Sequence, residues 1–193
     1  MRKGKIMRRF EATKQVFRAI NDELVICNIG HPSQEIFQIS DRPENFYMFG
    51  SMGLSSSIGL GVAMSQEKKV IALDGDGSVT MNMGTLATIG LTKPTNYMLI
   101  IIDNKAYGST GFQRSFTAGG LRLEEVAKAS GVQKVVVIDK EDKIQDAVAG
   151  CLSEDGPHVL VIKCEQGMPE GIGVIPINGM EVRNRFMVAA KPI

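Results

Sequence analysis

Two short polar segments contain residue types that can bind a divalent cation and a diphosphate. Asp76 lies directly after an apolar run, between Gly75 and Gly77. Asn104 closes the neighbouring apolar run, 28 positions later (104 minus 76). A carboxylate and an amide oxygen at adjacent strand ends can share one hard cation such as Mg²⁺, which prefers oxygen ligands and often bridges phosphates. The segments therefore predict a metal-bridged diphosphate, and the alternative is that both are ordinary turns after strands.

Both segments follow predicted strands in a regular alternation of helices and strands. Short β-branched apolar runs predict strands, and the stretches between them have helical periodicity. Continuous apolar strands separated by helices are typical of a mainly parallel sheet with helices on both faces. We therefore expect one doubly wound α/β layer. The predicted strands are 23–28, 45–49, 69–73, 96–103, 134–139 and 158–164, and the predicted helices are 8–21, 33–39, 54–64, 84–92, 123–130 and 143–152.

The loops after the predicted strands are the expected binding region, because ligands of open parallel sheets bind outside the carboxyl ends of the strands. These loops begin after Cys27, Phe49, Leu73, Asp103 and Cys164. Four of the five are rich in Gly, Ser or Asn. Glycine permits close approach of the backbone, and free N–H groups at a helix start attract anions. This composition predicts a phosphate-binding site formed by these loops, called the mouth loops below.

Composition excludes several classes of function. The 193 residues suffice for one well-buried domain, and 22 Lys and Arg against 21 Asp and Glu predict no nucleic-acid partner. Cys27, Cys151 and Cys164 form no C-x-x-C pair, which argues against a disulfide framework or a metal cradle. No apolar run suits a membrane span or an export signal. We expect a cytoplasmic protein with no membrane partner, a disordered extension at 1–6 and a domain at 7–193.

The two polar segments resemble the cofactor motif of thiamine-diphosphate enzymes, a GDG followed by an NN-type pair. Here GDGS is followed by Asp103 and Asn104, so an aspartate stands where the family has the first asparagine. The resemblance implies that Asp76 and Asn104 bind Mg²⁺ through their side chains, and Ala106 through its carbonyl oxygen. It also implies that the cofactor thiamine diphosphate contacts Gly30, Gly75, Gly77, Ser78, Tyr107, Gly108 and Ser109.

A second segment, GSMGLSSSIGLG, narrows this resemblance. Together with GHPSQEIF it is similar to the sulfopyruvate and phosphonopyruvate decarboxylase family, more than to acetolactate synthases or pyruvate decarboxylases. In that family a bulky apolar residue bends the cofactor, and Met52 occupies its place, with Gly50 and Ser51 beside the cofactor. The bend makes proton abstraction intramolecular, which implies a catalytic role for Met52. The alternative is that Met52 only fills a gap in the core.

The resemblance also implies a split active site. Single-chain relatives carry two similar α/β domains, and this chain has the length of the diphosphate-binding domain alone. In archaeal sulfopyruvate decarboxylases of coenzyme M biosynthesis, which form sulfoacetaldehyde and CO₂, the domains can be separate subunits. An α subunit is then expected to supply the pyrimidine-binding domain and the catalytic Glu, in an α₂β₂ or larger hetero-oligomer. Glu35, Glu44 and Glu67 of this chain are interpreted as surface charges.

The substrate is a 2-oxo acid by the same resemblance, and its binding residues are less clear. A second anionic group on the substrate requires cationic or donor side chains, and His31, Lys105 and Arg114 lie on the expected mouth loops. His31 is also a candidate proton relay, and the alternative for all three is a solvated surface position.

Three functions stay open at this point. The first is a decarboxylase subunit acting on sulfopyruvate, or on phosphonopyruvate. The second is a subunit of another enzyme with the same cofactor, such as an acetolactate synthase or a 2-oxo acid oxidoreductase. The third is a non-catalytic nucleotide-binding module, against which the absence of a G-x-x-x-x-G-K-[ST] motif counts.

Overall fold

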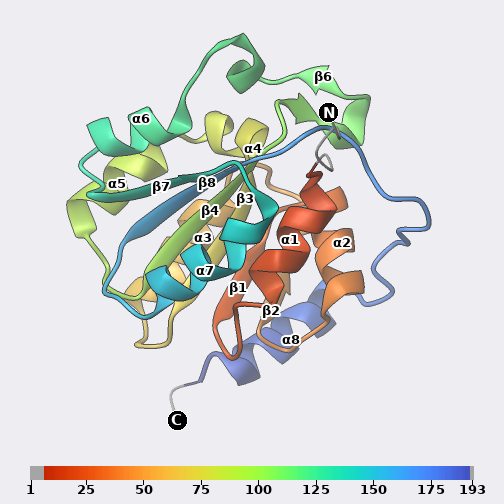
Figure 1. The fold of residues 1–193 in the computed structure, drawn as a ribbon. Helices are drawn as coiled ribbons and strands as arrows, with labels where there is room; N and C mark the ends of the chain where they lie inside the picture. Colours follow the sequence, from red (N-terminus) through yellow and green to blue (C-terminus); the bar gives the residue numbers. More distant parts are fainter. Residues whose placement is uncertain (1–6, 192–193) are drawn as a thin grey trace.

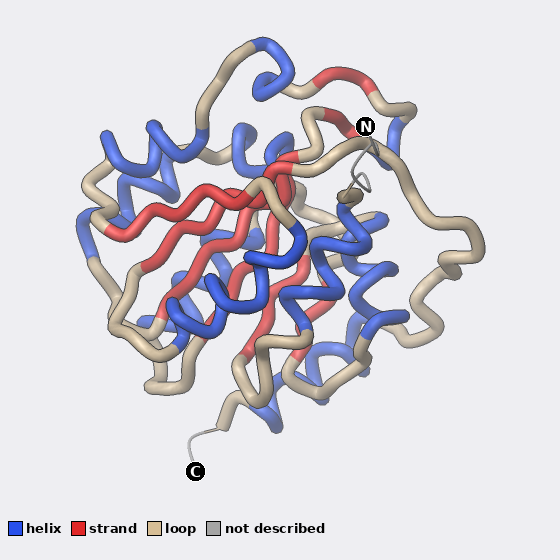
Figure 2. The backbone as a smooth tube through the Cα atoms, in the orientation of Figure 1, coloured by secondary structure: helices blue, strands red, loops and turns tan. Residues whose placement is uncertain are grey.

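The fold is built around one parallel sheet of six strands, which Figure 1 and Figure 2 show from the same side. The computed structural model describes residues 7–191, so the disorder expected for residues 1–6 falls outside the described residues. The strand order is β2-β1-β3-β4-β8-β7, and all neighbouring pairs are parallel. The expected doubly wound architecture is confirmed. The strands are β1 (Leu24–Cys27), β2 (Asn45–Tyr47), β3 (Val70–Gly75), β4 (Tyr97–Asp103), β7 (Lys134–Ile138) and β8 (His158–Lys163).

Helices cover both faces of the sheet, because successive strand residues point to opposite sides. Val25 and Cys27 of β1 belong to the core cluster under the helices α1, α2 and α7, which lie in front of the sheet in Figure 1. Leu24 and Ile26 belong to the second cluster, under α3, α5 and α6. All six predicted helices are present. They are α1 (Arg9–Phe17), α2 (His31–Ile39), α3 (Ser55–Met64), α5 (Gly84–Thr92), α6 (Leu123–Ala129) and α7 (Glu141–Leu152).

The chain changes direction across the sheet between β1 and β3. β1 leads through α2 to β2 at one edge, whereas β3 leads through α4 (Asp76–Met81) and α5 to β4 on the other side. The two connections leave the carboxyl ends of neighbouring strands on opposite faces of the sheet. A crevice therefore opens between them, in the position where open α/β sheets bind their ligands.

Three features were not predicted from the sequence: α4, the hairpin of β5 (Ala106–Tyr107) with β6 (Gln113–Arg114), and α8 (Gly179–Ala189). The helix α4 and the hairpin are too short to show a periodicity. A local signal for α8 did exist in the sequence, because Asn is a preferred N-cap residue and Asn178 directly precedes the helix. In the structure its side chain accepts a hydrogen bond from the Glu181 N–H at 3.0 Å.

The segment between β8 and α8 passes from one end of the sheet to the other beside α2 (Figure 1). Val174 of this segment and Phe37 of α2 line the same surface groove. Phe186 of α8 then packs edge-on against Phe46 of β2, with ring centroids 5.4 Å apart. The sequence left open whether this tail covers the substrate mouth or an interface, and α8 in fact packs at the β2 edge. No helix within residues 7–191 has the length and apolarity needed to cross a membrane.

Candidate cofactor-binding site

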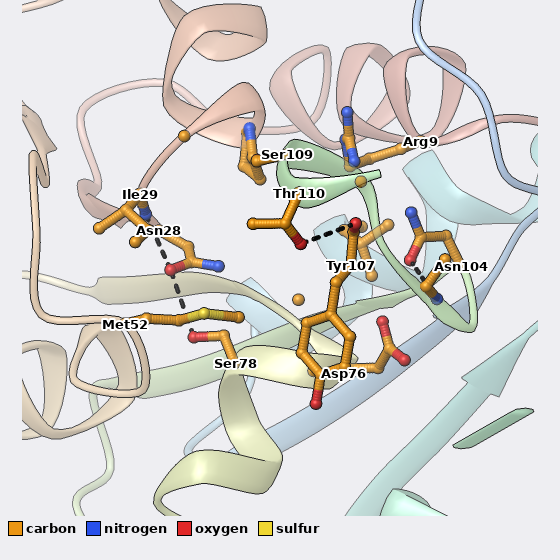
Figure 3. Close-up of a pocket in the computed structure, with 17 residues that line it drawn as sticks. Arg9, Asn28, Ile29, Met52, Asp76, Ser78, Asn104, Tyr107, Ser109 and Thr110 are labelled. Carbon is orange, nitrogen blue, oxygen red and sulfur yellow. Dashed lines mark hydrogen bonds between the residues drawn. The ribbon is translucent and has the colours of Figure 1, made fainter. Parts of the chain in front are cut away.

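A cavity of about 160 Å³ opens at the carboxyl ends of β1, β3 and β4, and Figure 3 shows its lining residues. It lies in the crevice where the chain changes direction, so the fold gathers three strand ends into one site. The residues expected from the sequence that line it are Gly30, Met52, Gly75, Asp76, Gly77, Ser78, Asn104, Ala106, Tyr107, Gly108 and Ser109. Those not expected are Arg9, Asn28, Ile29, Pro32, Ile102 and Thr110.

Asp76 forms the acidic wall of this cavity. The residue is 1% exposed, and its Oδ2 accepts hydrogen bonds from the hydroxyls of Ser115 and Thr117, the latter at 2.7 Å. Burial raises the pKa of the Asp76 carboxyl above its ordinary value, although both hydroxyls act in the opposite direction. A cation next to such a carboxyl would favour its ionised form.

Two acidic residues behind this wall, Asp103 and Glu124, form ion pairs with the basic residue Lys163. Lys163 Nζ lies 2.9 Å from Oδ2 of Asp103 and 2.9 Å from Oε2 of Glu124. The single hydroxyl proton of Thr117 is within reach of Asp103 Oδ1, at 2.8 Å, as well as of Asp76, so it can serve one carboxylate at a time. Within residues 7–191, Asp76 forms no ion pair with a basic side chain. The cavity wall therefore has an acidic group without a counter-ion in the described part of the chain.

Asn104 and Ala106 provide further oxygen atoms near Asp76. The Asn104 side-chain oxygen accepts a hydrogen bond from the Ala106 N–H at 3.2 Å, which closes a tight turn after β4. A carboxylate, an amide oxygen and a backbone carbonyl are all hard ligands of the kind that Mg²⁺ prefers. The described part of the chain holds no group of three His, Cys, Asp or Glu side chains suited to a metal ion. A cation at this edge would therefore depend on the mixed oxygen set.

A chain of hydrogen bonds joins the loops after β1, β2 and β3. The Gly53 N–H donates to the Ser78 hydroxyl at 2.9 Å, and this hydroxyl donates to Asn28 Oδ1 at 3.2 Å. The chain holds the loop that carries Met52, whose half-buried side chain borders the cavity. Asn28 was not among the expected site residues, although its place directly after the apolar run of β1 was a signal for it.

Two glycines let the backbone approach the cavity closely. Gly30 has a φ of 75°, and a Cβ at this position would lie 2.7 Å from Ser109 Oγ. A Cβ at Gly77 would overlap the ring of Tyr107. Side chains at either position would therefore displace the wall formed by residues 107–109, and their absence leaves a cradle with accessible backbone.

Glu35 is buried, so its interpretation as a surface charge was wrong. Its side chain is 0% exposed and accepts two hydrogen bonds from Arg9, Nε to Oε2 at 2.8 Å and Nη2 to Oε1 at 2.7 Å. Arg9 is itself only 6% exposed and lines the cavity. The two residues are 26 positions apart on different helices, and this pairing cannot be recognised from the periodicity of either helix.

His31 lies beside the cavity without lining it. It begins α2, where Pro32 provides the expected helix start, and its Nδ1 is buried without a hydrogen-bond partner among residues 7–191. Burial lowers the pKa of His31 below its ordinary value, and the charge of Arg9 lowers it further. A neutral imidazole at this position donates a hydrogen bond through one ring nitrogen and accepts one at the other.

The remaining expected residues are exposed and do not line the cavity. Gly50 and Ser51 precede Met52 on the same loop, and Ser51 has a positive φ of 63°. Lys105 also has a positive φ, 61°, in the turn before β5. Arg114 donates to the carbonyl of Ala118 at 2.7 Å. The structure thus leaves these four residues free to contact a ligand or partner that extends beyond the cavity.

The cavity fits the diphosphate end of thiamine diphosphate with a divalent cation. Asp76 is a buried carboxyl with no basic counter-ion among residues 7–191, and Asn104 and Ala106, which line the same cavity, carry oxygen atoms of the kind that Mg²⁺ prefers. The glycines that line the cavity, Gly30, Gly75, Gly77 and Gly108, place no side chain between the backbone and the cavity, which suits a phosphate that approaches the backbone closely.

A family comparison agrees with this geometry. The model of the thiamine pyrophosphate enzyme C-terminal TPP binding domain matches residues 29–162, a range that includes most of the cavity wall. This chain belongs to the thiamine pyrophosphate enzymes. Thiamine pyrophosphate is thiamine diphosphate under another name, so the family confirms the cofactor expected from the motif. The match begins after β1 and therefore does not include Arg9.

Curated relatives of this thiamine pyrophosphate enzyme share nearly its whole length. The chain is 50% identical over 186 residues to sulfopyruvate decarboxylase subunit beta of Methanococcus maripaludis, covering 95% of this chain and 97% of the relative. The subunit of the same name from Methanocaldococcus jannaschii is 42% identical, with the same coverage. Phosphonopyruvate decarboxylase of Streptomyces viridochromogenes is 37% identical over 86% of this chain and 41% of the relative.

A solved structure shows the same fold at lower identity. An X-ray structure from Mycobacterium smegmatis, assigned as a thiamin diphosphate-dependent enzyme, aligns with a TM-score of 0.66 at 20% identity. The alignment covers 82% of this chain and 32% of the other. The same fold therefore forms one part of a longer chain in that structure.

Proposed function

We propose that this chain is the diphosphate-binding subunit of a decarboxylase that converts sulfopyruvate to sulfoacetaldehyde and CO₂. The observation that carries this proposal is the 50% identity over 97% of a sulfopyruvate decarboxylase beta subunit. The cavity supports it, since it combines the residues of the cofactor motif at one strand edge. The domain is proposed to extend over 7–193, as expected from the sequence.

The oxygen set at the edge of β3 and β4 is proposed to hold Mg²⁺. Asp76 would contribute its carboxylate, Asn104 its side-chain oxygen and Ala106 its carbonyl oxygen. The metal would supply the counter-charge that Asp76 lacks within the described chain. Ser115 and Thr117 would orient the Asp76 carboxylate through their hydroxyls.

The glycine-rich loops are proposed to surround the diphosphate. Successive backbone N–H groups form anion-binding concavities, and glycines allow a phosphate to approach them. The proposed contacts are Gly30, Gly50, Ser51, Gly75, Gly77, Ser78, Tyr107, Gly108 and Ser109.

Bound thiamine diphosphate supplies the electron sink needed when CO₂ leaves a 2-oxo acid. Met52 is proposed to support the cofactor from below and hold it bent, because the Ser78–Gly53 hydrogen bond fixes the loop on which Met52 lies. This support would act by orientation, since a positioned group can react as if at very high concentration.

A partner α subunit is proposed to complete the active site. The relatives of similar length are called subunit beta, which implies an assembly with another subunit. We propose that this subunit supplies the pyrimidine-binding domain and the catalytic Glu, in an α₂β₂ or larger hetero-oligomer. The three free cysteines, Cys27, Cys151 and Cys164, are compatible with the proposed cytoplasmic location.

The anionic substrate is proposed to contact residues at the rim of the cavity. His31, Lys105 and Arg114 are the candidates, and His31 is also the candidate proton relay. Phosphonopyruvate is the second candidate substrate, because a phosphonopyruvate decarboxylase is 37% identical over most of this chain. Sulfonate and phosphonate groups require similar donors, so the substrate must be decided by assay.

The test is CO₂ release from sulfopyruvate and phosphonopyruvate by this chain with thiamine diphosphate and Mg²⁺, alone and after mixing with the candidate α subunit. Activity in the mixture alone supports a split site, and inactivity of a folded complex toward both substrates contradicts the proposal. Asp76→Asn should abolish Mg²⁺-dependent cofactor binding measured by calorimetry. The exposed Asp146 on α7 provides the matched control, Asp146→Asn, which should bind like the unmodified protein.

A further inference from the structure

Within residues 7–191, 17 residues line the cavity, and Arg9 is the single basic residue among them. The other charged lining residue is Asp76, whose role as a proposed metal ligand accounts for its charge. Arg9 belongs to α1, far from the cofactor motif in the sequence, and the family match starts at residue 29. Neither the motif nor the family match therefore accounts for its presence in the wall.

The hydrogen bonds of Arg9 leave one nitrogen available to a ligand. Nε and Nη2 donate to the two oxygens of Glu35, and Nη1 donates to no residue between 7 and 191. Gly108, which also lines the cavity, lies next to Nη1: a Cβ at Gly108 would be 3.3 Å from it. Because Gly108 has no side chain, Nη1 remains open on the side of the cavity loop.

Because it is buried, this ion pair contributes little net stabilisation to the fold. Arg9 and Glu35 have side chains that are 7% and 0% exposed, and the dehydration of both charges offsets much of their attraction. Apolar residues of similar volume would serve a core as well. What the pair does provide is a guanidinium fixed in orientation, whose remaining nitrogen, Nη1, can donate a charge-assisted hydrogen bond to a phosphate oxygen.

The position of Arg9 in the cavity indicates which part of the cofactor it would meet. Figure 3 shows Arg9 and Met52 on opposite sides of the cavity, with the loop of Tyr107 and Thr110 between them. Met52 is proposed to lie under the ring portion of the cofactor, and the terminal phosphate is the atom group farthest from that ring. A guanidinium across the cavity from Met52 is therefore positioned to contact the terminal phosphate.

We infer that Arg9, clamped by Glu35, binds the terminal phosphate of thiamine diphosphate through its free Nη1. This inference rests on the proposed function, in which the cavity holds the cofactor diphosphate. The neighbouring His31 does not replace Arg9 as the source of positive charge, since burial keeps its pKa low. Glu35 acts as a positioning residue: it orients the guanidinium and does not touch the cofactor itself.

The inference is tested with Arg9→Met combined with Glu35→Leu, so that no unpaired charge stays buried. Calorimetry of the complex with its partner subunit should show thiamine diphosphate binding, at constant Mg²⁺, weakened about 10- to 100-fold. The loss should lie in the dissociation constant of thiamine diphosphate and should exceed any change in the substrate KM measured at saturating cofactor. Arg8→Met removes the same charge from the adjacent exposed position and should change the dissociation constant less than about threefold.

Three outcomes overturn the inference. An unchanged dissociation constant in the folded double variant means that Arg9 does not bind the cofactor. An increased KM with unchanged cofactor affinity would assign Arg9 to the substrate instead. An equal loss in Arg8→Met would indicate a general effect of net charge. Absence of thiamine diphosphate binding by the unmodified complex would refute the proposed function as well, which separates the two failures.

Discussion

The buried pair of Arg9 and Glu35 predicts a specific pattern of stability changes. Removing one member of a buried ion pair typically lowers the free energy of unfolding by about 3–5 kcal/mol, because the other charge stays without water or partner. Glu35→Leu should lower the free energy of unfolding by about 3 kcal/mol, at the low end of this range, because the remaining Arg9 borders the cavity and water can reach its Nη1. Arg9→Met should lower it by about 5 kcal/mol near neutral pH, because the remaining Glu35 side chain is 0% exposed and has no access to water.

Replacing both members should remove most of this loss. The double variant Arg9→Met with Glu35→Leu leaves no charge in the core, and apolar replacements of buried ion pairs are often close to neutral. We expect its free energy of unfolding to lie within about 2 kcal/mol of the unmodified protein, so the coupling energy of the cycle should be at least about 6 kcal/mol.

Acid should affect the two single variants differently. The lone carboxyl left by Arg9→Met can be neutralised by a proton, whereas the lone guanidinium left by Glu35→Leu stays charged at every accessible pH. The loss in Arg9→Met should therefore shrink when the pH is lowered from about 7 to about 5, relative to the unmodified protein, and the loss in Glu35→Leu should not.

Urea unfolding followed by circular dichroism measures these differences, provided that the slope of the transition is unchanged. The control is Arg185→Met, which removes a bond of 2.9 Å to Asp41 between side chains that are 26% and 32% exposed. Such an exposed pair should contribute less than about 1 kcal/mol. The reasoning is refuted if both single variants at the buried pair lose no more than Arg185→Met.

Three further predictions concern the cavity and the pH dependence of the fold. Met52→Ala should lower kcat roughly 100-fold while changing cofactor affinity less than about tenfold, as steady-state kinetics and calorimetry would show, and equal losses would indicate simple packing. Gly77→Ala should push the Tyr107 ring into the cavity and weaken cofactor binding at least about tenfold, and unchanged calorimetric affinity would contradict the overlap. Burial, with the charge of Lys134, lowers the pKa of His158, so the unfolded chain binds a proton near pH 6.5 that the folded chain resists, and stability is lost as the pH falls below about 6.5. His158→Gln should make this slope shallower in urea titrations, and an unchanged slope would exclude His158 as its source.

The helices and strands, and the position of Asp76 and Asn104 at one edge of the sheet, could be predicted from the local sequence. Every predicted strand from 23–28 to 158–164 is present, because continuous apolar runs of that length are stable mainly as buried parallel strands. Asp76 and Asn104 were expected together for a geometric reason: residues that directly follow parallel strands must lie at the same edge of the sheet. The motif then identified the family, which the match over residues 29–162 confirmed.

Short and nonlocal features escaped this reasoning. The helix α4 and the β5–β6 hairpin have too few residues for a periodicity, so only their tertiary contacts define them. Ser115 and Thr117 reach Asp76 from about 40 positions away, at sequence separations of 39 and 41. Nothing in their local sequence distinguishes them from other loop hydroxyls.

The α/β class, the order of the main elements and the residues of the cofactor motif can all be derived from the amino-acid sequence, because each depends on local periodicity or on fixed spacing within neighbouring strands. The burial of Glu35, its ion pair with Arg9 and the position of Arg9 at the cavity become visible in the folded protein alone. The packing of α1 beside α2 brings those two charges together, and burial is a property of the whole fold that no single helix pattern contains.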